Sequence, residues 1–312
     1  MNIITRFKYR AQRQARGYAG FTLLEMTIVI VIISIVAISL VAMFSASLQK
    51  LQYQQTVVKM QTIQTALRNF RFAHNRLPCP ADATIVGVGT LNFGIEGANP
   101  GTCTGGVPAA NYSEILGSIN NIEGMVPTKT LELPDDYAID GWGRRIMYAV
   151  SSDLTQNGAF SIVNAFDGLT RMIIKNGQGT NITIHALEVL VSFGANGHGA
   201  FPRYGGLTRV NAGSVNVDEL NNCDCSNAGV YTAFNGTFVQ KDVLWDPANA
   251  LDNFDDLVFF TSRSNYILPS NIIGQPFTFS AAGAGADNPT TCQGGIPLCT
   301  ESGGIKQCVC GY

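Results

Sequence analysis

Gly20-Phe-Thr-Leu-Leu-Glu25, followed by nineteen uncharged residues from Met26 to Phe44, is the stretch that decides the fold. The twenty residues before Phe21 contain five basic side chains and no acidic one: Arg6, Lys8, Arg10, Arg13 and Arg16. An apolar run of about 20 residues is long enough to cross a bilayer as a helix, and a basic flank stays on the cytoplasmic side. We therefore expect one membrane-spanning helix, with everything that follows it outside the cytoplasm.

Two general interpretations leave part of this stretch unexplained. A secretory signal peptide has an apolar core of about 7 to 15 residues, which is shorter than this run. A plain membrane anchor fits the length but gives Glu25 no role. The exception is a capping box, in which the side chains of Thr22 and Glu25 bond the free amides at the helix start. The residues alone leave this second interpretation open.

The helix is expected to continue beyond the apolar run. Apolar residues recur there at spacings of three or four: Val57, Met60, Ile63, Leu67 and Phe70. This spacing is typical of an amphipathic helix that packs one face on a domain. The helix should end near Asn75, because Leu77 precedes Pro78 and is biased away from helical backbone. We predict a helix over residues 21–76, with a transmembrane half at 21–45 and an amphipathic half after it.

The rest of the chain, residues 77–312, reads as one β-rich head domain. Residues 78–110 are rich in Gly and Pro and predict a long loop. A Gly-bracketed turn then leads into a strand over residues 139–150. Further strands are expected near residues 159–166, 169–175, 182–193, 230–239 and 257–268, because Asn-Gly, Asp-Gly and Gly-Gly turn signals separate them. The predicted fold class is α+β, with the long helix packed on an antiparallel sheet.

Eight cysteines all follow residue 78, which suits an oxidising compartment. They are Cys79, Cys103, Cys223, Cys225, Cys292, Cys299, Cys308 and Cys310. Proximity along the chain favours Cys79 with Cys103 and Cys292 with Cys299, which leaves the two C-x-C pairs to cross-link to each other. A four-thiolate zinc site made by the two C-x-C pairs is the alternative, but structural zinc sites favour C-x₂₋₄-C spacing.

Charge and motifs argue against nucleic-acid binding and against catalysis. Beyond residue 20 the chain holds 15 Lys and Arg against 22 Asp and Glu, so the head is mildly acidic. The sequence contains no HExxH, no G-x-S-x-G and no phosphate-binding loop, and its three histidines are scattered. We expect a structural protein with no catalytic residue, no committed metal site and no nucleic-acid partner.

The segment from Gly20 to Ile33 resembles the N-terminus of type IV pilins and of the related pseudopilins of type II secretion. The resemblance implies that a prepilin peptidase cuts after Gly20 and methylates the new N-terminal Phe21. It also makes Glu25 the fifth residue of the mature chain, the position that the family uses in assembly. Residues 1–20 would then be a cytoplasmic leader. The implied partners are the peptidase, other pilin subunits, the membrane and an inner-membrane assembly platform.

Physical chemistry supplies a reason for Glu25 beside this resemblance. An ionised carboxylate in an apolar environment is costly unless it is paired. Cutting after Gly20 creates a positive amine at Phe21, and the carboxylate of one subunit can face the amine of a neighbour. Such a pair would fix the axial register between subunits.

A weaker resemblance to major pseudopilins extends into the head. It covers residues 140–148, with Gly141 where a proline usually stands, and also residues 192–197 and 254–257. In secretion pseudopilins this region holds calcium, but Asn196 here replaces the usual acid. Asp255 and Asp256 offer oxygen ligands, yet we expect a solvated turn at a strand edge and leave calcium as an alternative.

The sequence thus predicts a pilin-like structural subunit of a type IV pilus or a similar filament. It would be held in a bacterial inner membrane by one span, with the head in the periplasm, and would then form a periplasmic or cell-surface filament. One alternative is a pseudopilin of a type II secretion system. A more distant one is a membrane-tethered periplasmic binding protein or enzyme, in which the helix is only an anchor.

Overall fold

The structure is a computed structural model, and it divides into two compact units, Met1–Leu48 and Gln49–Tyr312, which are described separately. It describes residues 22–100, 103, 113–116, 119–160, 171–232, 234–244, 249–262, 277–280, 296–302 and 305–311. Side chains are not described at residues 38–46, 113–116, 119–120 and 250, nor beyond residue 262. Gly20 and Phe21 lie outside the described residues.

Helix α1 spans Leu23–His74. It ends where predicted, because Asn75 turns into the left-handed region (φ 53°) and its N–H bonds the carbonyl of Arg71 at 2.7 Å. Arg71 and His74 in the last turn place positive charge at the end that the helix dipole favours. Sequence spacing was therefore sufficient to locate this helix and its end.

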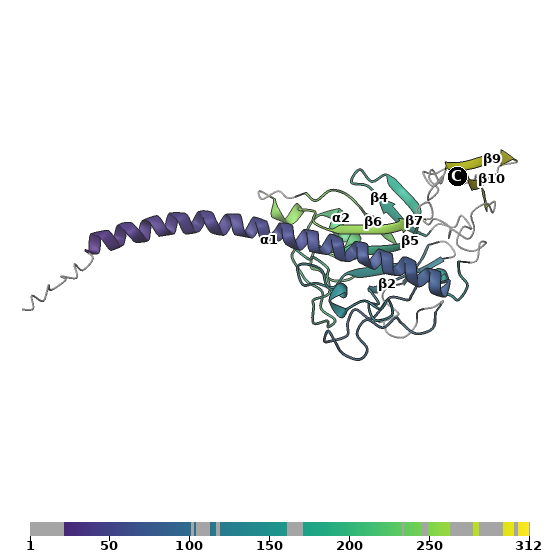
Figure 1. The fold of residues 1–312 in the computed structure, drawn as a ribbon, viewed down its shortest axis with the longest axis horizontal. Helices are drawn as coiled ribbons and strands as arrows, with labels where there is room; N and C mark the ends of the chain where they lie inside the picture. The colour runs from purple at the N-terminus through teal and green to yellow at the C-terminus, as the bar shows by residue number, and fades with distance from the viewer. Residues whose placement is uncertain are drawn as a thin grey trace, which may run out of the picture. The chain divides into compact units, whose positions relative to one another are not determined.

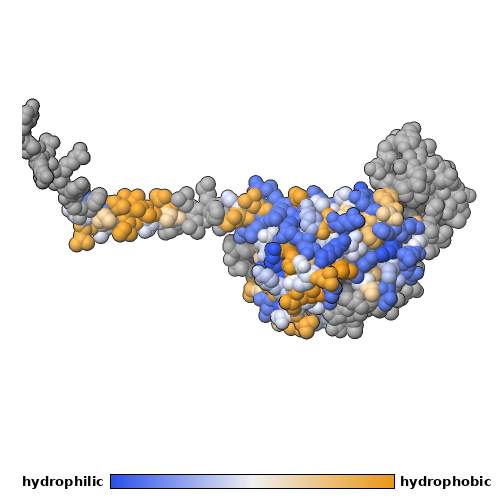
Figure 2. Space-filling view, turned by 60° about the horizontal axis from the view of Figure 1, so that its bottom comes forward, coloured by the Kyte–Doolittle hydropathy of each residue, from blue (hydrophilic) through white to orange (hydrophobic). Residues whose placement is uncertain are grey.

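The first turns of α1 expose large apolar side chains, several of which are visible in orange in Figure 2. The exposed large residues here are Leu23, Leu24, Met26, Ile28, Val29, Ile30, Val31, Ile32, Ile33, Ile35 and Val36. Across the part of the chain that the structure describes, no helix is both long enough and apolar enough to span a membrane.

The main sheet of the head is built around β5 (Asn181–Ser192). β3 (Met147–Ser151) and β4 (Met172–Lys175) pair with successive parts of β5, and β7 (Leu257–Ser262) pairs with residues 186–192. Because β3 and β7 bond the same residues of β5, they lie on its opposite edges. β2 (Ile119–Met125) and β1 (Ser113–Leu116) extend the sheet beyond β3.

One strand pairing departs from the predicted antiparallel sheet. β6 (Thr237–Val239) pairs with β4 in parallel, so the sheet is mixed. Strands β4, β6 and β7 fall within predicted segments, although β6 covers only the end of residues 230–239 and β7 stops at Ser262. Strand β5 matches the segment 182–193 with both ends shifted by one residue. The strand predicted at residues 159–166 lies almost wholly outside the described residues.

The tail forms a separate small sheet in the order β8-β10-β9, all antiparallel. These strands are Phe277–Ser280, Ile305–Gly311 and Ile296–Ser302 respectively. The other elements among the described residues are short: helix α2 (Val217–Cys223) and three 3₁₀ turns, η1 (Asp135–Ala138), η2 (Ser152–Thr155) and η3 (Ala250–Asp252).

The second half of α1 covers one face of the main sheet, as Figure 1 shows for its course along β5 and β7. The predicted stripe is buried there: Met60, Ile63 and Leu67 are fully buried and Phe70 nearly so, against Tyr148, Val150, Leu187 and Leu190. The alternate residues Met147 and Ala149 point to a second core on the other face, where Phe93, Phe201, Phe234 and Phe238 cover them. The head is therefore a sheet between a helix and a layer of long loops.

Polar contacts fix α1 on the head at η1 and at the turn that follows it. The ammonium of Lys59 donates to the Asp136 carboxylate at 2.7 Å and to the Asp136 and Ile139 carbonyls at 2.8 Å. The Gly141 N–H donates to the hydroxyl of Thr56 at 2.9 Å, and a Cβ at Gly141 would overlap the carbonyl of Gln52. A proline at residue 141 would lack this N–H and carry that Cβ, which explains the departure from the pseudopilin pattern.

Candidate functional site

The helix start forms the capping box that the sequence left open. The carboxylate Oε2 of Glu25 accepts from the Thr22 N–H at 2.9 Å and from the Thr22 hydroxyl at 3.1 Å. In return, the Glu25 N–H donates to the Thr22 hydroxyl at 3.2 Å. Both bonds to the carboxylate use Oε2, so the capping box leaves Oε1 for a further partner. A cap within one chain and a charge pair between chains are therefore compatible.

A second candidate site lies in the head, where two predicted segments meet. The Asn196 N–H donates to Asp255 Oδ2 at 2.7 Å, which joins the turn after β5 to the acidic pair before β7. Gly194 (φ 54°) lies directly against Asp255, and a side chain there would overlap its carbonyl. The resemblance to pseudopilins grouped these segments, and the structure brings them together.

The prediction of a solvated turn at this point is wrong. Asp255 is 5% exposed and Asp256 only 2%, because α2 and its flanking loops cover the strand edge. A third carboxylate joins them from α2, since Glu219 is 1% exposed. One oxygen from each of Glu219, Asp255 and Asp256 lies within 4.8 Å of the others.

Asn196 acts as a support within this acidic cluster. Its amide Nδ2 donates to both carboxylate oxygens of Glu219 at 3.0 Å, and Glu219 Oε1 also accepts from the Asp255 N–H at 3.0 Å. Glu219 is thus a third carboxylate of this cluster, and the amide of Asn196 orients it. Sequence reasoning missed Glu219 because it is 36 residues from Asp255 and belongs to no local motif.

The electrostatics of the cluster call for a neutralising partner. Burial raises the pKa of Asp255 to about 7, with Glu219 adding to the effect. Burial raises the pKa of Asp256 well above its ordinary range, and the negative Glu219 and Asp255 raise it further. Asp255 Oδ1 has no hydrogen-bond partner among the described residues. Three buried acids this close need protons or a cation, because unbalanced buried charge is costly.

The donor set fits a hard divalent cation. Carboxylate oxygens are the ligands that Ca²⁺ takes, and the unpartnered Asp255 Oδ1 supplies a free lone pair within the cluster. The positive side chains nearby bind other groups than these three carboxylates. Arg144 donates to the backbone carbonyls of Gly194 and Asn196, and Lys241 pairs with Asp218.

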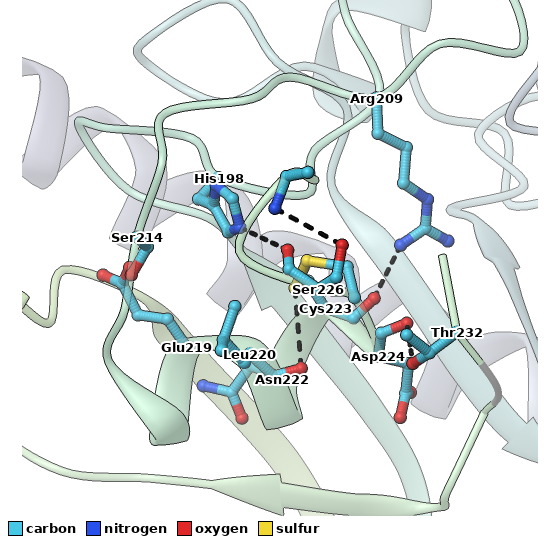
Figure 3. The surroundings of a disulfide bond; sticks show 12 residues. His198, Arg209, Ser214, Glu219, Leu220, Asn222, Cys223, Asp224, Ser226 and Thr232 are labelled. Atoms are coloured by element: carbon cyan, nitrogen blue, oxygen red, sulfur yellow. Dashed lines mark hydrogen bonds between the residues drawn. A yellow bond between two sulfur atoms is a disulfide. The ribbon is translucent and has the colours of Figure 1, made fainter. Parts of the chain in front are cut away.

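Two disulfides are present among the described side chains. Cys79 bonds Cys103, the pairing expected from chain proximity, and it closes the loop that follows α1. Cys223 bonds Cys225, so the predicted cross-link between the two C-x-C pairs is wrong for this pair (Figure 3). Asp224 is the reason, because its left-handed backbone (φ 48°) at the end of α2 brings its two neighbours together. The oxidised pair also excludes the four-thiolate zinc site in this state.

The remaining cysteines are described only in part. Cys292 lies outside the described residues, and Cys299, Cys308 and Cys310 are described by their backbone alone. Cys299 stands opposite Cys308 in the pairing of β9 with β10. The expected bond between Cys292 and Cys299 therefore stays a prediction.

In a comparison with known protein families, one family model matches the N-terminal part of the chain. Residues 15–41 match the prokaryotic N-terminal methylation motif, which includes Gly20, Phe21 and Glu25. No curated protein and no solved structure matches the chain. The chain thus carries, at residues 15–41, the N-terminal signature of type IV pilins and pseudopilins.

Proposed function

We propose that the protein is a structural subunit of a type IV pilus or a pilus-like filament. A prepilin peptidase cuts it after Gly20 and methylates Phe21, and the subunits then assemble through α1. The single observation that carries this proposal is the methylation motif at residues 15–41. The motif is typical of substrates of prepilin peptidases. Because subunits of pili and of type II secretion systems both carry it, the motif alone does not separate these two functions.

The change of character along α1 supports the proposal. Its first turns expose apolar side chains on a helix that is capped by Thr22 and Glu25. Its later turns bury one stripe on the head and are fixed there by Lys59. A helix of this kind suits a single inner-membrane span before assembly and a filament core afterwards, with the head on the periplasmic side and then on the filament surface.

Residues 200–230 of the head form the surface that we propose to make contacts on the outside of the filament. Part of it is buried, including Phe201 and Cys223, and so it belongs to the fold. The same segment exposes large apolar side chains at Tyr204, Leu207, Val217 and Val230. We propose that these side chains contribute to the contacts that the head makes in a filament.

Filament imaging tests the proposed function and separates it from its alternatives. Fibres sheared from cells that express the tagged chain should contain it, and a Gly20→Val variant should leave the chain uncut and absent from fibres. A pseudopilin predicts loss of secretion without long surface fibres. A membrane-tethered enzyme or binding protein predicts that the Gly20→Val variant keeps its function, which would contradict the proposal.

We further propose that Glu219, Asp255 and Asp256 bind calcium. The support is the buried cluster of three carboxylates and the unpartnered Asp255 Oδ1. Glu219 lies on α2 and the two aspartates lie just before β7. A bound ion would therefore link the segment containing α2 to the central sheet and stabilise the head.

A further inference from the structure

A second group of potential metal ligands has no part in the proposed function. It consists of His198, Cys223 and Cys225, and a ring nitrogen and the two sulfur atoms all lie within 4.8 Å of one another. The exposed fractions are 1%, 0% and 4%, so the three side chains are buried together. Figure 3 shows His198 beside the disulfide at the end of α2.

The disulfide between Cys223 and Cys225 contributes little constraint to the unfolded chain. The stabilisation that a disulfide gives by restricting the unfolded chain rises with the logarithm of the loop length. This disulfide joins residues two apart, against 24 for Cys79 and Cys103. Fold stabilisation is therefore a weak explanation for the C-x-C pair.

The backbone around the pair is held by bonds that do not depend on the disulfide. The Cys225 N–H donates to the Leu220 carbonyl at 3.2 Å, and the Thr232 N–H donates to the Asp224 carbonyl at 2.8 Å. The Arg209 guanidinium donates to the Cys223 carbonyl at 2.7 Å. These bonds should hold the two cysteines side by side after reduction as well.

The surroundings also accommodate two thiols. The Leu220 carbonyl oxygen lies 3.6 Å from Cys223 Sγ, within reach of the hydrogen that a thiol would carry. Gly199 (φ 78°) packs directly on the sulfurs, since a Cβ there would overlap Cys223 and Cys225. The turn that carries His198 therefore closes on the sulfur atoms with no side chain between.

The hydrogen bonds of His198 define which nitrogen can bind an ion. The Ala212 N–H donates to Nδ1 at 3.1 Å, so Nδ1 carries the lone pair and Nε2 carries the proton, which it donates to the Ser226 carbonyl at 3.0 Å. A ligating histidine usually donates its other N–H to a carbonyl or carboxylate. Ser226 would keep that supporting role while a metal ion takes the lone pair from the Ala212 N–H.

We propose that Cys223, Cys225 and His198 form a redox-controlled site for a thiophilic divalent cation of the zinc type. A dithiol reductant supplies two electrons and two protons to the disulfide and becomes a disulfide itself. The metal ion then displaces the two thiol protons and binds two thiolates and one imidazole, a ligand set that zinc takes with one position left open. A disulfide oxidant that accepts two electrons from the two thiolates re-forms the bond between Cys223 and Cys225, is itself reduced to two thiols, and releases the ion.

Cobalt titration of the full-length protein tests this site. The protein is reduced with dithiothreitol, desalted without oxygen and titrated with Co²⁺, whose thiolate charge-transfer absorption reports sulfur ligation. Cys225→Ser should lose one equivalent of bound Co²⁺ relative to the wild type. His198→Gln should weaken that equivalent at least about tenfold, because one ligand of three is removed. Cys103→Ser and His74→Gln, which change a cysteine and a histidine outside the group, should keep it.

The same titration can overturn the proposal. Equal cobalt binding by Cys225→Ser and Cys103→Ser, or by His198→Gln and His74→Gln, would do so. A second measurement avoids variants that fold poorly. Diamide is added to the cobalt-loaded wild-type protein, and peptide mapping follows the bond between Cys223 and Cys225. One equivalent of Co²⁺ should leave as that bond forms, and cobalt that stays bound after the bond has formed would contradict the site.

Discussion

Thr22 and Glu25 cap each other at the start of α1, with the Thr22 N–H donating to the Glu25 carboxylate and the Glu25 N–H donating to the Thr22 hydroxyl. The same carboxylate is the proposed partner of the Phe21 amine of a neighbouring subunit. These two roles make different demands on residue 25. The cap needs a hydrogen-bond acceptor, whereas the pair between subunits needs a negative charge.

Two substitutions of Glu25 separate these roles. Glu25→Gln keeps an acceptor that fits a capping box and removes the charge, while Glu25→Ala removes both. We expect both variants to be cut after Gly20 and both to lose at least about tenfold in filament yield, because each loses the charge pair. Quantitative blotting of sheared filaments measures this. Normal assembly by Glu25→Gln, with a defect only in Glu25→Ala, would assign Glu25 to the helix cap alone.

The close contact of Gly141 with α1 predicts a stability loss on substitution. Gly141→Ala places a Cβ against the Gln52 carbonyl, and we expect the free energy of unfolding to fall by about 1 to 3 kcal/mol. Gly141→Pro should cost more, because it also removes the N–H that bonds Thr56. Thr56→Val is the matched control that loses only this bond. Urea denaturation of each variant provides the comparison, and wild-type stability of Gly141→Ala would show that the contact relaxes freely.

Glu188 on β5 predicts a pH dependence of stability. Burial raises its pKa to about 7 from an ordinary 4.5, although Thr261 donates to it and Arg71 and Arg68 lower the pKa. The folded state therefore holds the proton more tightly than the unfolded state. The free energy of unfolding should fall as the pH rises from about 4.5 to about 7, by up to about 3 kcal/mol from this group.

Glu188→Gln tests this prediction, because the amide stays neutral and can still accept from Thr261. Thermal midpoints of both proteins are measured between pH 4.5 and pH 8. The difference between the variant and the wild type should grow in favour of the variant as the pH rises through this window. Two parallel curves would exclude Glu188 as a source of the pH dependence.

Calcium binding by the acidic cluster predicts a stabilisation that depends on the ion. At a calcium concentration about 100 times the dissociation constant, binding adds about 2.7 kcal/mol to the free energy of unfolding. Thermal midpoints in excess calcium and in excess chelator measure this gain. Glu219→Gln should abolish it, whereas the exposed Asp242→Asn, with the same loss of charge, should retain it. An equal response in both variants would place calcium elsewhere on the chain.

The sequence predicted what depends on local spacing. The stripe from Val57 to Phe70 located α1 because helical periodicity and burial coincide there, and Cys79 and Cys103 are close along the chain. The parallel pairing of β4 with β6 was missed, because it joins segments about 60 residues apart. Glu219 was missed for the same reason, since α2 brings it beside Asp255 only in the folded chain. The left-handed Asp224 that pairs its neighbouring cysteines has no sequence signal beyond the C-x-C spacing itself.

The mature N-terminus tests the central claim most directly. The chain is isolated from cells that contain a prepilin peptidase, and its N-terminal residue and intact mass are determined by mass spectrometry. The proposed function predicts a chain that begins at N-methylated Phe21, with cleavage lost in Gly20→Val. An intact Met1, or a first residue near Leu48 as a signal peptidase would leave, would contradict it.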